Sequence, residues 1–320
     1  MKIFSSAQSV ARDPDLAHKK LHMAVGNFDG LHLGHRRLLQ KALQNKRQWG
    51  GLLAVYSFNP HPQSFLSPLK KHILLENRET WYYRLREFGV DVLIEENFTK
   101  EFSEKSAEHF LQHQWHERLN LQSLVVGEDF RFGYQRQGDI KLLKSWSQQN
   151  GIDFSPISPV LINNQRVSTS GIKSLLFEGR PQQISNYLGR PFSIRGVVQP
   201  GDQKGRELGY PTMNIIDASA ELLKRGVYVT SVRGALDVWE AITNVGVRPT
   251  VHNVSPVVVE AHILNKFQDN LYGQTVEIEF LEFLREEKKF SSFEDLKMQI
   301  SQDVQLAQEF FRSRHRGLKD

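Results

Sequence analysis

The sequence predicts two domains of different class, a doubly wound α/β domain with a parallel sheet and then a small antiparallel β-barrel that ends in one helix. Three observations support this prediction. The length of 320 residues is roughly twice that of a typical domain. The first half alternates short apolar runs with longer helical patterns, as strands and helices of a parallel sheet do. The second half changes to short β-rich runs punctuated by glycine and proline.

In the first half, a strand is predicted at LHMAV from Leu21, a helix at LLQKALQNKRQW and a second strand at LLAVYSF. Further strands are predicted at VDVLI, LVVG and FSPISPVLI, the last of which ends at Ile162. Two short helical patterns, IKSLLFEG and PQQISNYLG, follow and are separated by Arg180-Pro181, a helix stop and restart. We place the domain boundary in this region, with residues 1–185 in the first domain and residues 186–320 in the second.

Beyond Pro191, strands are predicted at FSIRGVV, GVYVTSV, VWEAITNVGV, VVVEAHIL and TVEIEFLEFL. The last helix is expected from about Phe293 to about Phe311. Five antiparallel runs of this length favour a closed or nearly closed barrel.

The composition excludes several classes of chemistry and of partner. The chain has no cysteine, which excludes disulfides, thiolate metal sites and cysteine nucleophiles. No apolar stretch is long enough to span a membrane, and the first residues lack the apolar core of a secretory signal, so a cytoplasmic protein is expected. The net charge of +5 suits anionic ligands but is too small to indicate nucleic acid.

The segment AVGNFDGLHLGHRRLL combines a strand end, a glycine-containing turn and a helix start that carries two histidines. Backbone N–H groups in the first turn of a helix attract phosphates, and His32 and His35, three residues apart, share one helix face. Imidazoles can stabilise the charge that grows on an attacked α-phosphate without a covalent intermediate. Gly34 leaves room for a nucleotide to approach the backbone.

Three more segments of the first half place polar loops after predicted strands. They are Ser57-Phe58-Asn59-Pro60-His61-Pro62, the run from Val126 to Gly133, and Val167-Ser168-Thr169-Ser170-Gly171-Ile172-Lys173. Loops at the carboxyl ends of parallel strands line the ligand crevice of a doubly wound sheet.

The second half carries its own candidate site. The segment GDQKGRELGYPTMN brings glycines and cations together before Thr212 and Asn214, which alternate onto one face of an extended segment and can reach one Mg²⁺ or its phosphate oxygens. The segment is not an ordinary P-loop. In VVVEAHIL, Glu260 and His262 share the polar face of a strand whose other face is apolar. A carboxylate there can act as the general base for an alcohol that attacks a γ-phosphate.

These motifs, in this order, resemble the bacterial bifunctional riboflavin kinase and FMN adenylyltransferase (FAD synthetase) family over nearly all of residues 20–312. GNFDGLHLGH is similar to its G-x-F-D-G-x-H-x-G-H signature, and the other segments are similar to its T/S-F-x-P-H-P, V-G-x-D-F-R-F-G, I-S-S-T-x-I-R and P-T-x-N elements. NVGVRPTV and LYG complete the likeness. The resemblance implies a Rossmann-like nucleotidyltransferase domain that converts FMN to FAD with release of pyrophosphate, and a riboflavin kinase barrel that makes FMN from riboflavin. ATP is the co-substrate of both reactions, Mg²⁺ is the implied cofactor, and only small-molecule partners are expected.

The resemblance also implies residue roles, with His32, His35 and Glu260 as the catalytic residues. In the first domain the implied ATP-binding residues are Gly26, Asn27, Phe28, Asp29, Gly30, His32, Gly34, His35, Ser168, Thr169 and Lys173. The implied FMN-binding residues are Asn59, His61, Asp129, Phe130 and Arg131. In the kinase domain the implied ATP-binding residues are Gly205, Arg206, Gly209, Pro211, Thr212 and Asn214, of which Thr212 and Asn214 also hold the metal.

Two positions depart from the family pattern. Lys173 replaces an arginine that grips two phosphate oxygens at once, and Asn265 stands roughly where the family often has aspartate. The first departure leaves open a riboflavin kinase with weakened or lost adenylyltransferase activity. An H-x-G-H string also occurs in other nucleotidyltransferases and in class I aminoacyl-tRNA synthetases, so such an enzyme is the second alternative. The sequence has neither a K-M-S-K-S-like loop nor an aromatic-rich RNA-binding signature, which argues against an enzyme that acts on RNA.

A zinc site is a further alternative, because His109, His113 and His116 have a spacing that one helix face can bring together. No carboxylate is expected to complete this site, and a solvated helix face is the preferred interpretation.

Overall fold

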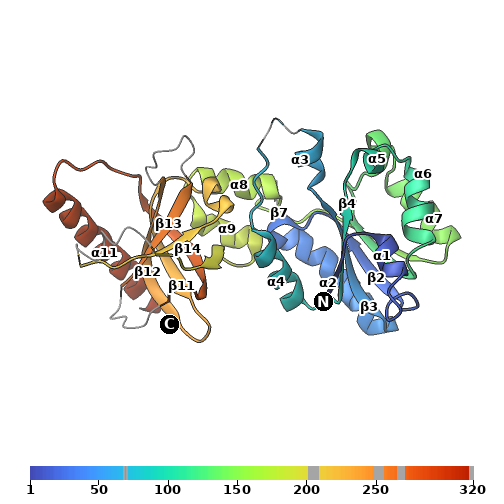
Figure 1. Cartoon of the computed structure of the whole chain (residues 1–320), viewed down its shortest axis with the longest axis horizontal. Coiled ribbons are helices and arrows are strands. Elements are labelled where there is room, and N and C mark those ends of the chain that lie inside the picture. The colour runs from blue at the N-terminus through green and yellow to red at the C-terminus, as the bar shows by residue number, and fades with distance from the viewer. Residues whose placement is uncertain (68, 70, 201–208, 248–255, 265–270, 317–320) are drawn as a thin grey trace. The chain divides into compact units, whose positions relative to one another are not determined.

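The computed structural model describes residues 1–67, 69, 71–200, 209–247, 256–264 and 271–316 (Figure 1). The chain divides into two compact units. The first unit comprises Met1–His72 and Arg78–Ser168, and the second comprises Ile73–Asn77 and Thr169–Asp320. Among the described residues, no helix combines the length and the apolar character that crossing a membrane requires.

The first unit is built on a six-stranded parallel sheet, as predicted. Its strands are β1(Lys2–Phe4), β2(Leu21–Val25), β3(Leu52–Asn59), β4(Val92–Asn97), β5(Leu121–Gly127) and β6(Asp153–Ile157). Their order in the sheet is β1-β4-β3-β2-β5-β6. The winding direction therefore reverses between β2 and β5, and ligands of open α/β sheets bind at the carboxyl ends of the strands beside such a reversal.

Helices and short hairpins surround this sheet (Figure 1). They are α1(Ala7–Ala11), η1(Asp29–Leu31), α2(Leu33–Trp49), α3(Pro62–Leu66), α4(Arg78–Phe88), α5(Lys100–Ser103), α6(Ala107–Phe110), η2(Leu111–His116), η3(Tyr134–Arg136), α7(Ile140–Gln149), β7(Leu161–Ile162) and β8(Gln165–Arg166). Alternate side chains of β3 pack in two separate hydrophobic clusters. Leu53 and Val55 belong to the cluster that contains Leu39, whereas Ala54 and Tyr56 belong to the other cluster. Both faces of the sheet are therefore covered, which explains the continuous apolar run of β3.

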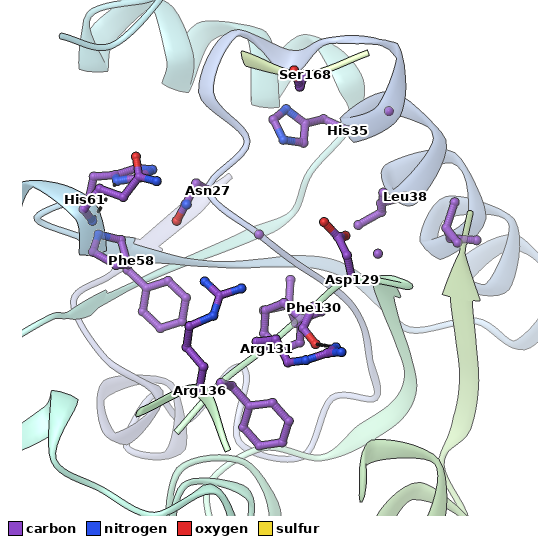
Figure 2. Close-up of a pocket in the computed structure, with 18 of the residues that line it drawn as sticks. Asn27, His35, Leu38, Phe58, His61, Asp129, Phe130, Arg131, Arg136 and Ser168 are labelled. Atoms are coloured by element: carbon purple, nitrogen blue, oxygen red, sulfur yellow. Dashed lines mark hydrogen bonds between the residues drawn. The ribbon is translucent and has the colours of Figure 1, made fainter. Parts of the chain in front are cut away.

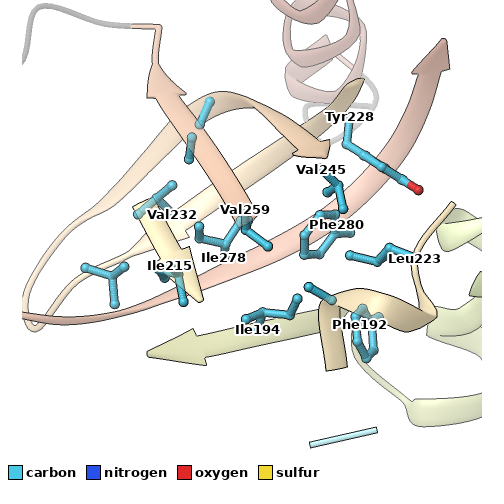
Figure 3. Packing of buried hydrophobic residues seen from close by; sticks show 14 of the residues in the cluster. Phe192, Ile194, Ile215, Leu223, Tyr228, Val232, Val245, Val259, Ile278 and Phe280 are labelled. Atoms are coloured by element: carbon cyan, nitrogen blue, oxygen red, sulfur yellow. The ribbon is translucent and has the colours of Figure 1, made fainter. Parts of the chain in front are cut away.

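The second unit is a six-stranded antiparallel barrel. Its strands are β9(Phe192–Val197), β10(Met213–Ile216), β11(Gly226–Arg233), β12(Val238–Val247), β13(Val257–Ile263) and β14(Thr275–Arg285), in the order β10-β13-β12-β11-β14-β9. The two edge strands approach each other where Gln199 N donates to Asn214 O at 2.8 Å, so the barrel is nearly closed. Figure 3 shows side chains such as Ile194, Val259 and Phe280 filling its interior.

Three helical segments and one segment without regular structure complete the barrel core. The segments α8(Thr169–Phe177), α9(Pro181–Leu188) and η4(Ala218–Leu222) contribute buried side chains to it, and so does Leu75 of the segment Ile73–Asn77. That segment is held by an ion pair between Glu76 and Arg190 at 2.5 Å and by a hydrogen bond from Asn77 to Asp217 at 2.5 Å. Compact packing thus begins at Thr169, whereas the predicted boundary between residues 185 and 186 stays a prediction about where the chain can be divided.

The C-terminal helix α11(Phe293–Arg316) extends five residues beyond its predicted end at Phe311. Its residues Ala307 and Phe311 pack against Val229 and Ile242 on the outside of the barrel. A buried ion pair between Arg285 and Asp303, at 2.7 Å, fixes the helix to β14.

Candidate active sites

A pocket of about 710 Å³ lies at the carboxyl ends of β2, β3, β5 and β6, within the first unit. It is lined by Val25 and Gly26 after β2, Phe58 on β3, Gly127 on β5 and Ile157 on β6. This is the edge of the sheet where the winding reverses, and the polar loops were expected to meet here.

The two histidines of the H-x-G-H string stack on each other at the start of α2. Their ring centroids are 3.6 Å apart and the rings are 13° from parallel. The backbone N–H of His35 donates to Nδ1 of His32 at 3.2 Å, so Nδ1 keeps its lone pair and the proton of the neutral ring is on Nε2. Burial lowers the pKa of His32 to about 4 and holds the pKa of His35 well below its usual value. Both rings are therefore neutral N–H donors at pH 7.

The structure explains the glycine at position 34 in a way that the sequence did not indicate. A Cβ atom at this position would lie 3.0 Å from Cε1 and 3.1 Å from Nδ1 of His32. The missing side chain therefore makes room for the stacked imidazole, in addition to any approach of a nucleotide. The Nδ1 atom of His35 is buried and has no hydrogen-bond partner among the described residues, so it is a polar atom that a ligand could satisfy.

Most of the predicted residues of the first domain line this pocket, and Figure 2 shows several of them around it. They are Gly26, Asn27, His32, Gly34, His35, His61, Asp129, Phe130, Arg131 and Ser168. Ser168 and Thr169 fall on either side of the division between the two units, and Thr169 and Lys173 lie in α8 of the second unit. Asn59 ends β3 but does not line the pocket.

The ring of Phe28, one of the predicted ATP-binding residues, lies in the core of the first unit, so its role in ATP binding stays a prediction for its backbone. Its side chain is 0% exposed and belongs to the apolar core, and its carbonyl oxygen accepts a hydrogen bond from Trp81 Nε1 at 3.1 Å. Phe28 has a φ of 53° and Gly30 a φ of 73°, so the turn that also contains Asp29 is made from left-handed backbone. Phe28 fixes the shape of the turn, and its ring is not available to a ligand.

The pocket also contains residues that were not among the predicted site residues, although Phe58 and Phe132 lie within two of the quoted motifs. Aromatic side chains form much of its lining; they are Phe58, Phe98, Phe102, Phe110, Phe132 and Tyr134. Three cations, Lys105, Arg136 and Arg166, accompany them. Arg166 forms an ion pair with Asp129 at 2.6 Å. These residues come from several loops far apart in the sequence, so no local pattern could have grouped them.

The candidate site of the second unit lies on neighbouring barrel strands. Asn214 on β10 is directly opposite Glu260 on β13, and Glu260 is directly opposite Asn244 on β12. Glu260 and His262 are partly exposed whereas Val259 and Ala261 are fully buried, which confirms the predicted alternation of the strand.

Asn214 is only 2% exposed, and neither Nδ2 nor Oδ1 of its amide has a hydrogen-bond partner among the described residues. An amide left in this state costs free energy unless a ligand satisfies it. Thr212 is half-buried just before β10, and the oxygen of Pro211 contacts His262 Nδ1 at 2.8 Å. Gly209, with a φ of 86°, precedes them. The predicted residues Gly205 and Arg206, and the departure at Asn265, lie outside the described residues.

The alternative zinc site is not formed. The described residues contain no cluster of three or more histidines or carboxylates that could hold a metal ion. A carboxylate does lie beside one of these histidines, since Glu117 Oε2 is 2.9 Å from Nδ1 of His113. This pair is exposed at the end of η2, where Glu117 follows the last helical residue.

Comparisons with known proteins match both halves of the chain. The FAD synthetase family model matches residues 15–171, and the riboflavin kinase family model matches residues 188–311. A bifunctional riboflavin kinase/FMN adenylyltransferase from Haemophilus influenzae is 35% identical over 294 residues, which cover 91% of this chain and 94% of the relative. The protein of the same description from Escherichia coli K12 is 32% identical over 290 residues, 90% of this chain and 92% of the relative.

A solved structure also resembles the whole chain. It is a protein from Streptococcus pneumoniae described as a macrolide-efflux protein, with a TM-score of 0.81 and 25% identity. The match covers 96% of this chain and 98% of that one, so both units have a counterpart in a single solved fold.

Proposed function

Since the chain belongs to the bifunctional riboflavin kinase/FMN adenylyltransferase family, we propose which of its residues carry out each of the two reactions. The chain is a transferase that phosphorylates riboflavin to FMN and adenylylates FMN to FAD. The first reaction belongs to the barrel and the second to the parallel-sheet unit, as the two family models divide the chain.

In adenylyl transfer, a phosphate oxygen of FMN attacks the α-phosphorus of ATP, the bond from this phosphorus to the bridging oxygen breaks, and pyrophosphate leaves. The turn from Gly26 to Gly30 and the start of α2 bind the nucleotide through backbone N–H groups. His32 and His35 donate hydrogen bonds to the α-phosphate oxygens as negative charge grows on them. Because burial lowers both pKa values, each ring would donate its N–H as a neutral imidazole. No covalent adenylyl-enzyme is formed.

We assign the remaining predicted residues of this site by their place in the family motifs. Ser168, Thr169 and Lys173 hold the β- and γ-phosphates of ATP. Asn59, His61, Asp129, Phe130 and Arg131 bind FMN, and the aromatic side chains around Phe130 provide a surface suited to the flat flavin ring.

In riboflavin phosphorylation, the ribityl 5′-oxygen attacks the γ-phosphorus of ATP, and Glu260 accepts the proton of this hydroxyl. The bond from the γ-phosphorus to the bridging oxygen breaks, and ADP leaves with that oxygen. Thr212 and Asn214 are assigned to Mg²⁺ and the phosphate oxygens, and Gly205, Arg206, Gly209 and Pro211 to ATP. The unsatisfied amide of Asn214 fits a hard cation and its phosphate ligands, because its oxygen is a suitable donor and its NH₂ can bind a phosphate oxygen. When bound, Mg²⁺ neutralises charge on the transferred phosphoryl group.

The observation that best supports this assignment is the alignment of Asn214 and Glu260 across two paired strands, which puts the proposed metal-binding amide beside the proposed base. The cytoplasmic location and the absence of nucleic-acid partners remain predictions from the sequence.

The test is to incubate the purified chain with riboflavin, ATP and Mg²⁺ and to separate FMN, FAD and pyrophosphate over time. We expect FMN to form first and FAD with pyrophosphate to follow. FMN without any FAD would support a kinase that has lost its adenylyltransferase activity, and release of neither flavin product would contradict the proposal.

A further inference from the structure

The pocket of the first unit has two chemically different regions. Backbone and polar groups of Gly26, Asn27, His35 and Ser168 line one region, whereas the other is lined by aromatic rings such as Phe130. A phosphate that is attached to a flavin and attacks ATP must lie where these regions meet. The cations of the pocket are therefore the candidates to hold it.

Four cations line the pocket, and three of them already have a contact. Arg166 is paired with Asp129 at 2.6 Å. Arg131 donates from Nη1 to the backbone oxygen of Phe130 at 2.9 Å. Lys105 lies over the ring of Phe102 at 5.1 Å, and burial lowers its pKa.

Arg136 is different. Within the described part of the chain its side chain forms no hydrogen bond or ion pair, and Figure 2 shows it directed into the pocket. Guanidinium is always charged, and its planar fork matches the oxygens of a phosphate.

The backbone of η3 holds Arg136 in an unfavourable conformation. Gln135 and Arg136 have φ values of 50° and 60°, a region that residues with a side chain rarely adopt. The turn is fixed at its base, where Gly138 N donates to Phe132 O at 2.9 Å, and at its start, where Tyr134 N donates to Lys105 O at 2.7 Å. Gly138 cannot be replaced without movement, because a Cβ there would lie 2.6 Å from the Phe132 ring. This local structure fixes the direction in which the Arg136 side chain leaves the backbone.

We propose, on the basis of the adenylyltransferase function above, that the Arg136 guanidinium binds the 5′-phosphate of FMN and so makes the pocket select FMN over flavins without a phosphate. This contact gives the enzyme a means to exclude riboflavin, which has the same ring and ribityl chain, from the adenylylation site. Discrimination of this kind is strong when a site is built for a charged group that the competitor lacks.

The test measures FAD formation from FMN and ATP by the full chain, with lumiflavin as a competitor that has the flavin ring but neither a phosphate nor a ribityl hydroxyl. Arg136→Ala is expected to raise the KM for FMN by about tenfold or more, since it removes a charge-assisted contact, while the inhibition constant of lumiflavin stays unchanged. Arg136→Lys keeps the charge but not the fork and should give an intermediate KM. Arg86→Ala on α4, an exposed arginine of the same unit outside the pocket, is the matched control.

An unchanged KM for FMN in Arg136→Ala would overturn the proposal, and so would an equal loss of FMN and lumiflavin binding, which would mean that Arg136 only shapes the pocket. If the Ala variant does not fold, the same two outcomes are read from Arg136→Lys and Arg136→Gln. Failure of the unmodified chain to form FAD would instead contradict the proposed function.

Discussion

The two units build their sites from different parts of their sheets. In the first unit, the candidate residues come from loops that follow parallel strands, and the two histidines begin a helix. In the second unit, Asn214 and Glu260 lie on the strands themselves, directly opposite each other on the neighbouring strands β10 and β13. The residues of a loop site are contiguous in the sequence and form a recognisable motif. The residues of a strand site are brought together by alternation along each strand and by the pairing register between strands.

The two sites also differ in how they handle polar groups. The first satisfies part of its hydrogen-bonding capacity internally, since Nδ1 of His32 caps α2 by accepting from the backbone N–H of His35, and burial keeps both rings neutral. The second leaves the whole amide of Asn214 unsatisfied. The first site therefore leaves one ring atom, Nδ1 of His35, for a ligand, whereas the second leaves both polar atoms of an amide.

The largest expected effect is on the strand site. Glu260→Gln keeps the shape of the side chain but removes the proton acceptor, so FMN formation from riboflavin should fall by about 10²- to 10⁴-fold. FAD formation from added FMN should not change, because His32 and His35 are in the other unit. Measured turnover of both reactions checks this, and an undiminished kinase rate would dismiss Glu260 as the base.

The loop site should show the reverse behaviour. His35→Ala, like His32→Ala, removes a donor to the α-phosphate and should lower FAD formation by about 10²- to 10³-fold. FMN formation from riboflavin should remain. Single-turnover assays of each reaction provide the measurement, and a joint loss of both activities in folded protein would contradict the separation of the sites.

The packing of the second unit gives a prediction about how the chain can be divided. Ile172 and Leu176 of α8 and Ile184 of α9 are fully buried in the barrel core. A fragment of residues 169–320 should therefore be more stable than one of residues 186–320, which lacks all three side chains. We expect each of them to contribute roughly 1.5–3 kcal/mol to the free energy of unfolding. Urea unfolding of the two fragments compares their free energies of unfolding directly. Equal stability would show that α8 and α9 are dispensable and would favour the predicted boundary at 185/186.

A smaller effect is expected at Lys173, where the family pattern has arginine. Lys173→Arg restores a fork that can grip two phosphate oxygens and should raise FAD formation by roughly tenfold or less, with kinase turnover unchanged. Initial rates of the two reactions test this. If FAD forms no faster and Lys173→Ala is as active as the unmodified chain, Lys173 does not contact the phosphates of ATP.

The sequence predicted the order of elements well wherever the hydrophobic pattern was long and regular. The span of β12 matches the predicted run VWEAITNVGV, because residues with strand preference such as valine, isoleucine, threonine and tryptophan recur along its ten residues. The strand β1 was not predicted, since it is three residues long and its pairing with β4 gives no local signal. The packing of α8 and α9 on the barrel was also not visible, because an amphipathic pattern does not say which core its apolar face joins.

The pocket of the first unit could be predicted only in part, because a sequence motif shows which residues are neighbours in the chain but not which of them meet in space. The histidines and the loop residues Asn27 and Asp129 were identified because each lies in a contiguous motif. Phe28 belongs to the same motif but is buried, and a motif does not show which of its members point inward. Arg136 closely follows the motif that ends at Gly133, but its place beside the aromatic lining is visible only in three dimensions.

The central claim is that one chain carries two independent sites, and mixing two variants tests it most directly. Glu260→Gln and His35→Ala protein are each supplied with riboflavin, ATP and Mg²⁺, separately and then together, and flavins are separated over time. The account predicts that the first variant alone forms neither FMN nor FAD, that the second forms only FMN, and that the mixture forms FAD after FMN has accumulated. If either folded variant proves to have lost both activities, so that the mixture forms no FAD, the two-site account is contradicted.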